Sequence, residues 1–315
     1  MRHGWRRGAA WAGVAMLLLT GCDPWAEETE AAAGRLRVVA TIGMIADVAA
    51  QVGGDRVFVQ GLMGPGVDPH LYKARAGDVR RLSRADLVLY NGLHLEAAMG
   101  EVLEEMGRRR HTVAVAESVP APALIATPDF GGSHDPHVWF DVALWSQVAR
   151  RIEEALAEAD PAHAAEYAQR GSAYRTELGR LDAWVRERVA AVPPERRVLI
   201  TAHDAFGYFG RAYGFEVMGL QGISTSSEAG TGDVQRLVDV IVTRRIPAIF
   251  LETSIPPRNI RAVVAAARSR GFALRQGGEL YSDALGDTGT PEGTYLGMVR
   301  HNVETIVNAL VQEAQ

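Results

Sequence analysis

His70 and His137 each end the tripeptide Asp-Pro-His, which occurs twice and carries the clearest chemical signal in the sequence. In each copy the Asp can cap a following helical turn and the Pro suits its first position, so the His projects from a stiff corner. The positive end of such a turn disfavours imidazolium and keeps the ring neutral. Because a neutral imidazole binds metal ions, the repeated tripeptide favours metal ligation over two ordinary helix starts.

Further candidate ligands follow predicted strands in the second half of the chain. A run of apolar residues leads directly into Ala-His-Asp, which places His203 at the carboxyl end of a predicted central strand. Open α/β sheets bind their ligands at that edge. Asp283 lies in a loop after the last predicted strand, on the same edge. Spacing alone does not distinguish Asp283 from Asp204, Asp287 or Glu279 as the carboxylate of the site.

Asp204 and Glu252 are predicted to support the ligating imidazoles, which usually donate their other N–H to a carboxylate or carbonyl. Asp204 adjoins His203, and Glu252 ends a neighbouring predicted strand. His94 and His134 are weaker candidates near the edge of the site. The other histidines, which we expect in the leader or on the surface, are His3, His111, His163 and His301.

The elements that must position these residues alternate between strands and helices. In the first half, residues 36–42, 57–63, 86–90 and 112–115 are predicted strands, and 43–52, 77–85, 94–106 and 142–159 are predicted helices. In the second half, 198–201, 215–220, 248–252 and 272–274 are predicted strands, and 206–213, 233–245, 259–270 and 291–311 are predicted helices. Because helical crossovers join parallel strands, we predict an α/β fold with two lobes, each a mainly parallel sheet of about four strands.

Residues 162–192 lie between the halves and contain no proline. A continuous helix of this length would be roughly 45 Å long and would resist hinge motion. Gly171 and Gly179 leave open two helices broken near either glycine, since a glycine costs only about 1 kcal/mol inside a helix. The predicted division is therefore an N-terminal lobe at 36–161, a connecting helix at 162–192 and a C-terminal lobe at 193–315.

The N-terminus predicts export. Residues 1–21 combine arginines with an apolar run shorter than the roughly 20 residues that span a bilayer, as in a signal peptide. Cys22 is the single cysteine, and Leu-Thr-Gly-Cys resembles the bacterial lipobox, in which the cysteine is acylated after cleavage. The alternative is a chance cysteine after an ordinary signal or a weak membrane anchor. Residues 22–35 then form an acidic tether, and the expected location is the outer face of the cell membrane, with the chain attached by lipid.

The composition of the chain excludes several classes of protein. With 315 residues, 47% hydrophobic and 23% charged, the chain is too apolar for a disordered protein and too polar for a polytopic membrane protein. The net charge of -5 and the absence of long basic runs argue against a nucleic-acid partner.

Longer motifs in both halves carry a family resemblance. They are Thr-Ala-His-Asp-Ala-Phe-Gly-Tyr-Phe, Gly-Ile-Ser-Thr-Ser-Ser-Glu, Leu-Tyr-Ser-Asp-Ala-Leu-Gly and Gly-Thr-Tyr-Leu-Gly-Met-Val-Arg-His-Asn. Together with the two Asp-Pro-His tripeptides, they resemble the zinc and manganese solute-binding lipoproteins of ABC transporters, which are helical-backbone metal receptors. The resemblance covers residues 36–310. It implies that one divalent ion lies between the lobes, held by His70, His137, His203 and Asp283, and that residues 162–192 form a rigid helix.

The resemblance implies capture of a metal ion outside the membrane and delivery to an ABC permease with its ATPase, by a protein that is not an enzyme. We expect a monomer. The main alternative is a secreted zinc-dependent hydrolase, which would keep a water on the metal and a general base nearby, but the sequence lacks His-Glu-x-x-His. A cell-adhesion role, suggested by the names of some relatives, has no repeat or exposed aromatic surface to support it.

Two departures from the family pattern bear on which metal the site would bind. Residues 120–132 contain no histidine, unlike the His-rich loop of many zinc-dedicated members of the family, and dedicated manganese members often have Glu where this chain has His203. Three imidazoles and one carboxylate suit four-coordinate Zn²⁺. A bidentate Asp283 would instead serve Mn²⁺ or Fe²⁺.

Overall fold

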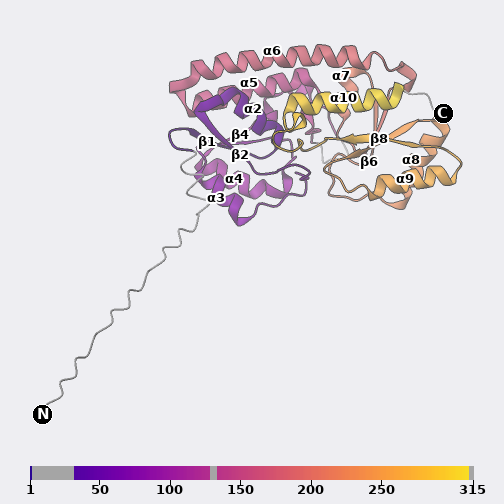
Figure 1. Ribbon diagram of the computed structural model, residues 1–315, viewed down its shortest axis with the longest axis horizontal. Coiled ribbons are helices and arrows are strands. Elements are labelled where there is room, and N and C mark those ends of the chain that lie inside the picture. The colour runs from indigo at the N-terminus through magenta and orange to yellow at the C-terminus, as the bar shows by residue number, and fades with distance from the viewer. Residues whose placement is uncertain (2–31, 128–132, 312–315) are drawn as a thin grey trace. The chain divides into compact units, whose positions relative to one another are not determined.

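The computed structural model describes Met1, residues 32–127 and residues 133–311 (Figure 1). Cys22, the rest of the predicted signal peptide after Met1, most of the tether and residues 128–132 lie outside the described residues. The described residues from Gly34 onward form one compact unit. Within the described ranges, no helix is both long enough and apolar enough to cross a membrane.

The first half is built on a four-stranded parallel sheet in the order β2-β1-β3-β4. Its strands are β1 (Leu36–Ala40), β2 (Val57–Gly61), β3 (Leu87–Tyr90) and β4 (His111–Ala114), and its helices are α2 (Gly43–Gly53), α3 (Ala76–Arg84), α4 (Gly100–Arg109) and α5 (Val142–Ala159). Neighbouring residues such as Val38 and Val39 are both buried. Burial on both faces is typical of a parallel sheet covered by helices.

The helix predicted at residues 94–106 begins later than expected. Gly92, Leu93 and His94 all have positive φ angles, of 81°, 53° and 65°. Left-handed backbone cannot start a right-handed helix. A short 3₁₀ turn, Ala97–Met99, therefore precedes α4.

The second half contains two parallel strand pairs in place of one predicted four-stranded sheet. The pairs are β5 (Val198–His203) with β6 (Glu216–Gln221), and β7 (Ala248–Glu252) with β8 (Arg275–Leu280). The helices are α7 (Gly207–Tyr213), α8 (Thr231–Arg244), α9 (Arg258–Ser269) and α10 (Tyr295–Val311). Ile200 of β5 and Ile249 of β7 share one apolar cluster, so the two pairs pack together.

The prediction of the last strand at residues 272–274 was wrong, because β8 lies further on, at Arg275–Leu280. This strand reads Arg-Gln-Gly-Gly-Glu-Leu and has almost no apolar signal. Its glycines serve packing, since a Cβ at Gly277 would collide with the ring of Phe250. Glycine in a strand often marks such a close approach.

One helix, α6 (Ala164–Val189), connects the halves without interruption over 26 residues (Figure 1). It continues through both Gly171 and Gly179, so the alternative of two broken helices is excluded. Helices α5, α2 and α10 pack along it. The predicted α/β class, with parallel sheets flanked by helices and one long connecting helix, is confirmed.

Candidate metal centre

Four buried side chains from separate parts of the fold converge on one point. His70 lies in the loop after β2, His137 directly precedes the 3₁₀ turn Val138–Phe140, His203 ends β5, and Asp283 follows β8. Their ligand atoms all lie within 4.8 Å of one another. Each residue is at most 5% exposed. The structure thus brings together the set that the resemblance implied.

The spacing of these atoms suits a divalent ion. Nε2 of His70 lies 3.3 Å from Nε2 of His137, and Nε2 of His203 lies 3.2 Å from Oδ2 of Asp283. Nε2 of His137 is 3.5 Å from Oδ1 of Asp283, and Nε2 of His70 is 3.8 Å from Oδ2. Tetrahedral ligands at about 2.1 Å from zinc would be roughly 3.4 Å apart. These four separations are therefore close to the spacing of ligands around a bound zinc ion.

The polar atoms at this point also indicate a cation site. Nε2 of His203 and both carboxylate oxygens of Asp283 are buried and make no hydrogen bond with any described residue, although they lie within ion-pair distance of one another. Buried polar atoms without hydrogen bonds are costly and uncommon. The three imidazole rings are tilted by 53° to 82° against one another, so their edges and not their faces meet. A divalent cation would satisfy all of these atoms at once.

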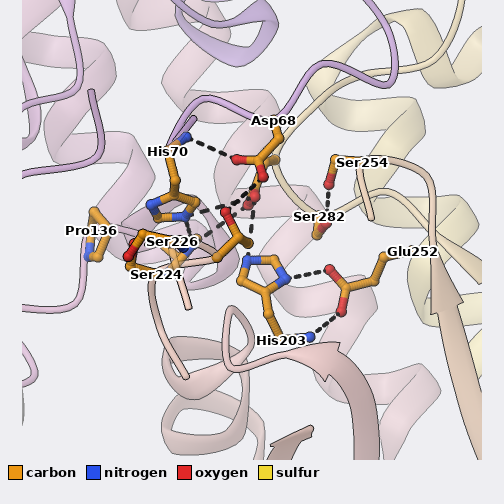
Figure 2. A network of polar contacts seen from close by, with 12 residues as sticks. Asp68, His70, Pro136, His203, Ser224, Ser226, Glu252, Ser254 and Ser282 are labelled. Carbon is orange, nitrogen blue, oxygen red and sulfur yellow. Dashed lines mark hydrogen bonds and ion pairs between the residues drawn. The ribbon is translucent and has the colours of Figure 1, made fainter. Parts of the chain in front are cut away.

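Carboxylates orient two of the imidazoles through Nδ1, the ring nitrogen that does not face the cluster. Asp135 Oδ1 accepts from the backbone N–H of His137 at 2.9 Å and lies 2.7 Å from its Nδ1. Glu252 receives the backbone N–H of His203 at 2.8 Å, and its Oε2 lies 2.6 Å from Nδ1, as Figure 2 shows. With Nδ1–H donating to a carboxylate, the Nε2 lone pair faces the ion.

Of the two predicted supporting carboxylates, Glu252 is the one that the described part of the chain shows hydrogen-bonded to a ligating imidazole. Glu252 bonds to His203, whereas among the described residues the structure gives no hydrogen bond between the Asp204 carboxylate and His203. Sequence reasoning assigned Asp135 only a capping role and missed its bond to Nδ1 of His137. The signal was present, because Asp135 is part of the Asp-Pro-His tripeptide itself.

The other candidates lie outside the four-residue cluster. His94 and His134 line a separate cavity of about 650 Å³ beside Glu117. Glu279 is exposed, and its carbonyl accepts a hydrogen bond from His301 at 3.1 Å. Asp287 is exposed as well. The fold thus selects Asp283 from the carboxylates that spacing could not separate.

Burial and charge act differently on the three imidazoles. Burial lowers the pKa of His70 to about 3, against the opposing effect of Asp283. Burial also lowers the pKa of His137, but the carboxylates of Asp135 and Asp283 outweigh it and raise the value to about 9. For His203, Glu252 and Asp283 overcome burial and hold the pKa well above its usual range.

The pKa of Asp283 moves in the opposite direction. Burial raises it, but His203 and His137 more than compensate and keep it well below its usual range. The opposite directions of these pKa shifts have one cause, the attraction between the Asp283 carboxylate and the imidazoles of His137 and His203. A divalent cation at this point would take the place of protons on these imidazoles.

Comparisons with known proteins agree with this geometry. Residues 38–309 match the family described as zinc-uptake complex component A, periplasmic. The chain belongs to this zinc-uptake family. It is 52% identical over 300 residues to the zinc-binding protein TroA of Treponema pallidum, covering 95% of this chain and 97% of TroA. It is also 48% identical over 296 residues to the manganese-binding lipoprotein MntA of Bacillus subtilis, covering 94% of this chain and 96% of MntA.

A solved structure supports the same family assignment. The periplasmic zinc-binding protein TroA from Treponema pallidum superposes with a TM-score of 0.87 at 53% identity, covering 89% of this chain and all of that chain (100%). The zinc-uptake family contains solute-binding components of metal ABC importers and not enzymes. The predicted family and the predicted non-enzymatic class are therefore confirmed.

Proposed function

We propose that this protein binds one divalent metal ion, zinc or manganese, outside the cell membrane and delivers it to the permease of an ABC importer. The observation that carries the proposal is the buried cluster of three imidazoles and one carboxylate within 4.8 Å. Four protein ligands complete a tetrahedral shell, whereas a metallohydrolase keeps one position for water. The cluster favours carriage of the ion over catalysis.

Both metals remain candidates for physical reasons. Three imidazoles with one carboxylate oxygen suit tetrahedral zinc. The two oxygens of Asp283 face different imidazoles, His203 and His137, so bidentate binding would raise the coordination number in favour of manganese or iron. The printed names of TroA and MntA, one zinc-binding and one manganese-binding, support the same two candidates.

Competition titrations of the processed protein with Zn²⁺, Mn²⁺ and Fe²⁺ test this proposal. Alanine at His70, His137, His203 or Asp283 is expected to weaken binding more than the roughly 10- to 100-fold typical of residues behind the ligands. Alanine at His134 or His301, two histidines outside the cluster, serves as the matched control and should change little. Full affinity in the His203→Ala or Asp283→Ala protein would contradict the site, and turnover of ester, peptide or phosphate substrates would favour the hydrolase.

We propose that acylated Cys22 anchors the protein at the membrane, where it would deliver the ion. An acyl chain contributes about 0.8 kcal/mol per buried methylene, and two chains hold a protein stably on a bilayer. In cell fractionation, Cys22→Ala is expected to leave the protein unprocessed or released, while Trp25→Ala, outside the lipobox, should remain anchored. Normal processing and membrane retention of Cys22→Ala would exclude the anchor.

The division into lobes completes the proposal. Residues 36–161 and 193–315 would act as two lobes joined by the helix of residues 162–192, with the ion between them. The origin of the ligands supports this division, because His70 and His137 precede α6 whereas His203 and Asp283 follow it. Permease and ATPase partners and a monomeric state are part of the same proposal.

A further inference from the structure

The two Asp-Pro-His tripeptides form the same type of turn, but their Asp carboxylates make different side-chain hydrogen bonds. In both, Oδ1 of the Asp accepts the backbone N–H of the His at 2.9 Å. Asp135 uses the same oxygen to bind Nδ1 of His137, so that ring is oriented within its own tripeptide. In Asp68, by contrast, Oδ2 accepts a hydrogen bond of 2.6 Å from the hydroxyl of Thr225, which lies 157 positions later in the chain.

His70 consequently lacks the direct support that the other imidazoles have. Its Nδ1 is buried and makes no hydrogen bond with a described residue. The turn that presents its Nε2 is held by Asp68, which Figure 2 shows bonded to the His70 backbone. The orientation of His70 therefore depends on what holds Asp68.

Thr225 is itself fixed to the second half of the fold. Its loop, residues 222–230, is closed by a hydrogen bond from Gln221 Nε2 to the Ser227 carbonyl at 3.0 Å. Arg258 of α9 pairs with Glu228 of the loop at 2.6 Å. Thr225 is only 6% exposed at the centre of the loop. Its hydroxyl therefore bonds to Asp68 from a loop that is attached to β6 and α9 of the second half.

The His137 segment is attached to the second half in a different way. The hydroxyl of Tyr208 donates to the Asp135 carbonyl at 2.8 Å, and the indole of Trp139 donates to the Ser282 carbonyl at 3.0 Å. Neither of these bonds involves the Asp135 carboxylate. If one contact between the halves opened, the Asp135 carboxylate would still orient His137, whereas Asp68 would lose the Thr225 bond that holds it and keep only its own bond to the His70 backbone.

We propose that Thr225 is a positioning residue for the bound ion, which holds Asp68 and thereby presents His70 to the metal. Opening of the Thr225–Asp68 bond frees the His70 turn, so His70 is the first ligand to leave when the ion is released. This inference rests on the proposed metal-binding function and adds to it the residue that controls metal release.

Dissociation rates of Zn²⁺ and Mn²⁺, measured by chelator chase on the processed protein, test the role of Thr225. Thr225→Val keeps the shape of the side chain but removes the donor to a carboxylate. Loss of a hydrogen bond to a charged group corresponds to a dissociation that is roughly 10-fold faster or more. Thr225→Ser, which restores the hydroxyl, should return the rate to within about 2-fold of the unsubstituted protein.

Thr127→Val is the matched control. Thr127 is also 6% exposed, and its hydroxyl donates to the carbonyl of Ser133 and not to Asp68. Its metal dissociation rate is expected to be unchanged. Unfolding midpoints of the metal-free variants identify any general loss of stability, and Thr225→Ala repeats the test if the valine variant does not fold.

A double-substitution cycle separates positioning from general packing. If Thr225 acts through His70, Thr225→Val should add no further effect in a His70→Ala background. An equal effect in both backgrounds, or dissociation of Thr225→Val at the original rate, would overturn the inference. If the unsubstituted protein binds none of the metals, the proposed function fails instead, so the two failures are distinguishable.

Discussion

At the scale of residues, metal binding competes with protons on His137 and His203. The pKa of His137 is raised to about 9 and that of His203 well above its usual range, so both shifts favour the protonated rings in the absence of metal. Because an imidazole must lose that proton to ligate, we expect about two protons released per ion. Affinity should already fall as the pH falls below about 9, the raised pKa of His137, and not only below the ordinary histidine pKa near 6.5. Titration calorimetry in buffers of different ionisation enthalpy measures the proton count.

Carboxylate substitutions provide the control for this count. Asp135→Asn removes the group that raises the pKa of His137, and Glu252→Gln does the same for His203, so each should release about one proton fewer. Asp160→Asn affects a similar pair, since Asp160 lies 2.7 Å from Nδ1 of His163 but outside the metal centre. Its proton count should equal that of the unsubstituted protein. Binding without proton release would contradict the assignment of charge.

The sequence predicts the metal ligands better than the carboxylates that hydrogen-bond to them. His70 and His137 could be found because their tripeptides are local, and His203 because a strand end is readable from apolar residues. Asp204 and Glu252 were both predicted to support the imidazoles, Asp204 as a chain neighbour of His203 and Glu252 as the end of a neighbouring strand. The structure shows the hydrogen bond with Glu252, which reaches His203 across 49 positions of sequence through the packing of β7 against β5.

At the scale of elements, Trp139 links the segments that carry His137 and Asp283. Its indole donates to the carbonyl of Ser282, and its ring lies 5.2 Å from the His137 ring. Trp145 is also fully buried, but its indole nitrogen makes no hydrogen bond with a described residue. Trp139→Phe should therefore cost about 1 kcal/mol more stability than Trp145→Phe in urea unfolding, because it alone breaks a buried hydrogen bond. It should also weaken metal binding, and equal effects of the two substitutions would refute the link.

Helix α6 contains two glycines in different surroundings. No atom lies within 4 Å of a Cβ added at Gly179, which is exposed, whereas a Cβ at Gly171 would collide with the carboxylate of Glu153 on α5. Gly179→Ala should therefore stabilise the protein by about 0.5–1 kcal/mol, since alanine favours the helix and restricts the unfolded chain. Gly171→Ala should gain less or lose stability. Denaturant unfolding of the metal-free proteins compares them, and a larger gain at Gly171 would contradict the packing.

The positions of β8 and of the start of α4 could not be predicted from hydrophobic periodicity. β8 could not be read because its polar residues and paired glycines carry no strand pattern, and its place follows from the Phe250 ring and pairing with β7. The later start of α4 depends on the left-handed backbone of Leu93 and His94, which these residue types rarely adopt. In both cases tertiary packing overrides the local preference.

At the scale of the whole molecule, α6 is attached to both halves of the fold. Near its start, Arg170 donates to the carbonyls of Val52 and Gly53 at 2.8 and 2.9 Å. Near its end, Arg188 pairs with Glu304 of α10 at 2.6 Å. A continuous helix of 26 residues, about 39 Å long, resists bending between these points. Metal release should therefore proceed through loop changes and a small tilt, and not through a wide hinge opening.

Small-angle scattering of the metal-free and metal-bound protein tests this expectation. The two radii of gyration should agree within about 1 Å, because sliding of packed helices is small. Gly179→Pro places a helix breaker at an exposed position, at a cost of about 3 kcal/mol in helix formation, and Gly179→Ala is its matched control. If the intact helix limits the motion, the proline variant should expand on metal removal while the alanine variant should not. A change of several Å in the unsubstituted protein would show that α6 does not restrain the two halves.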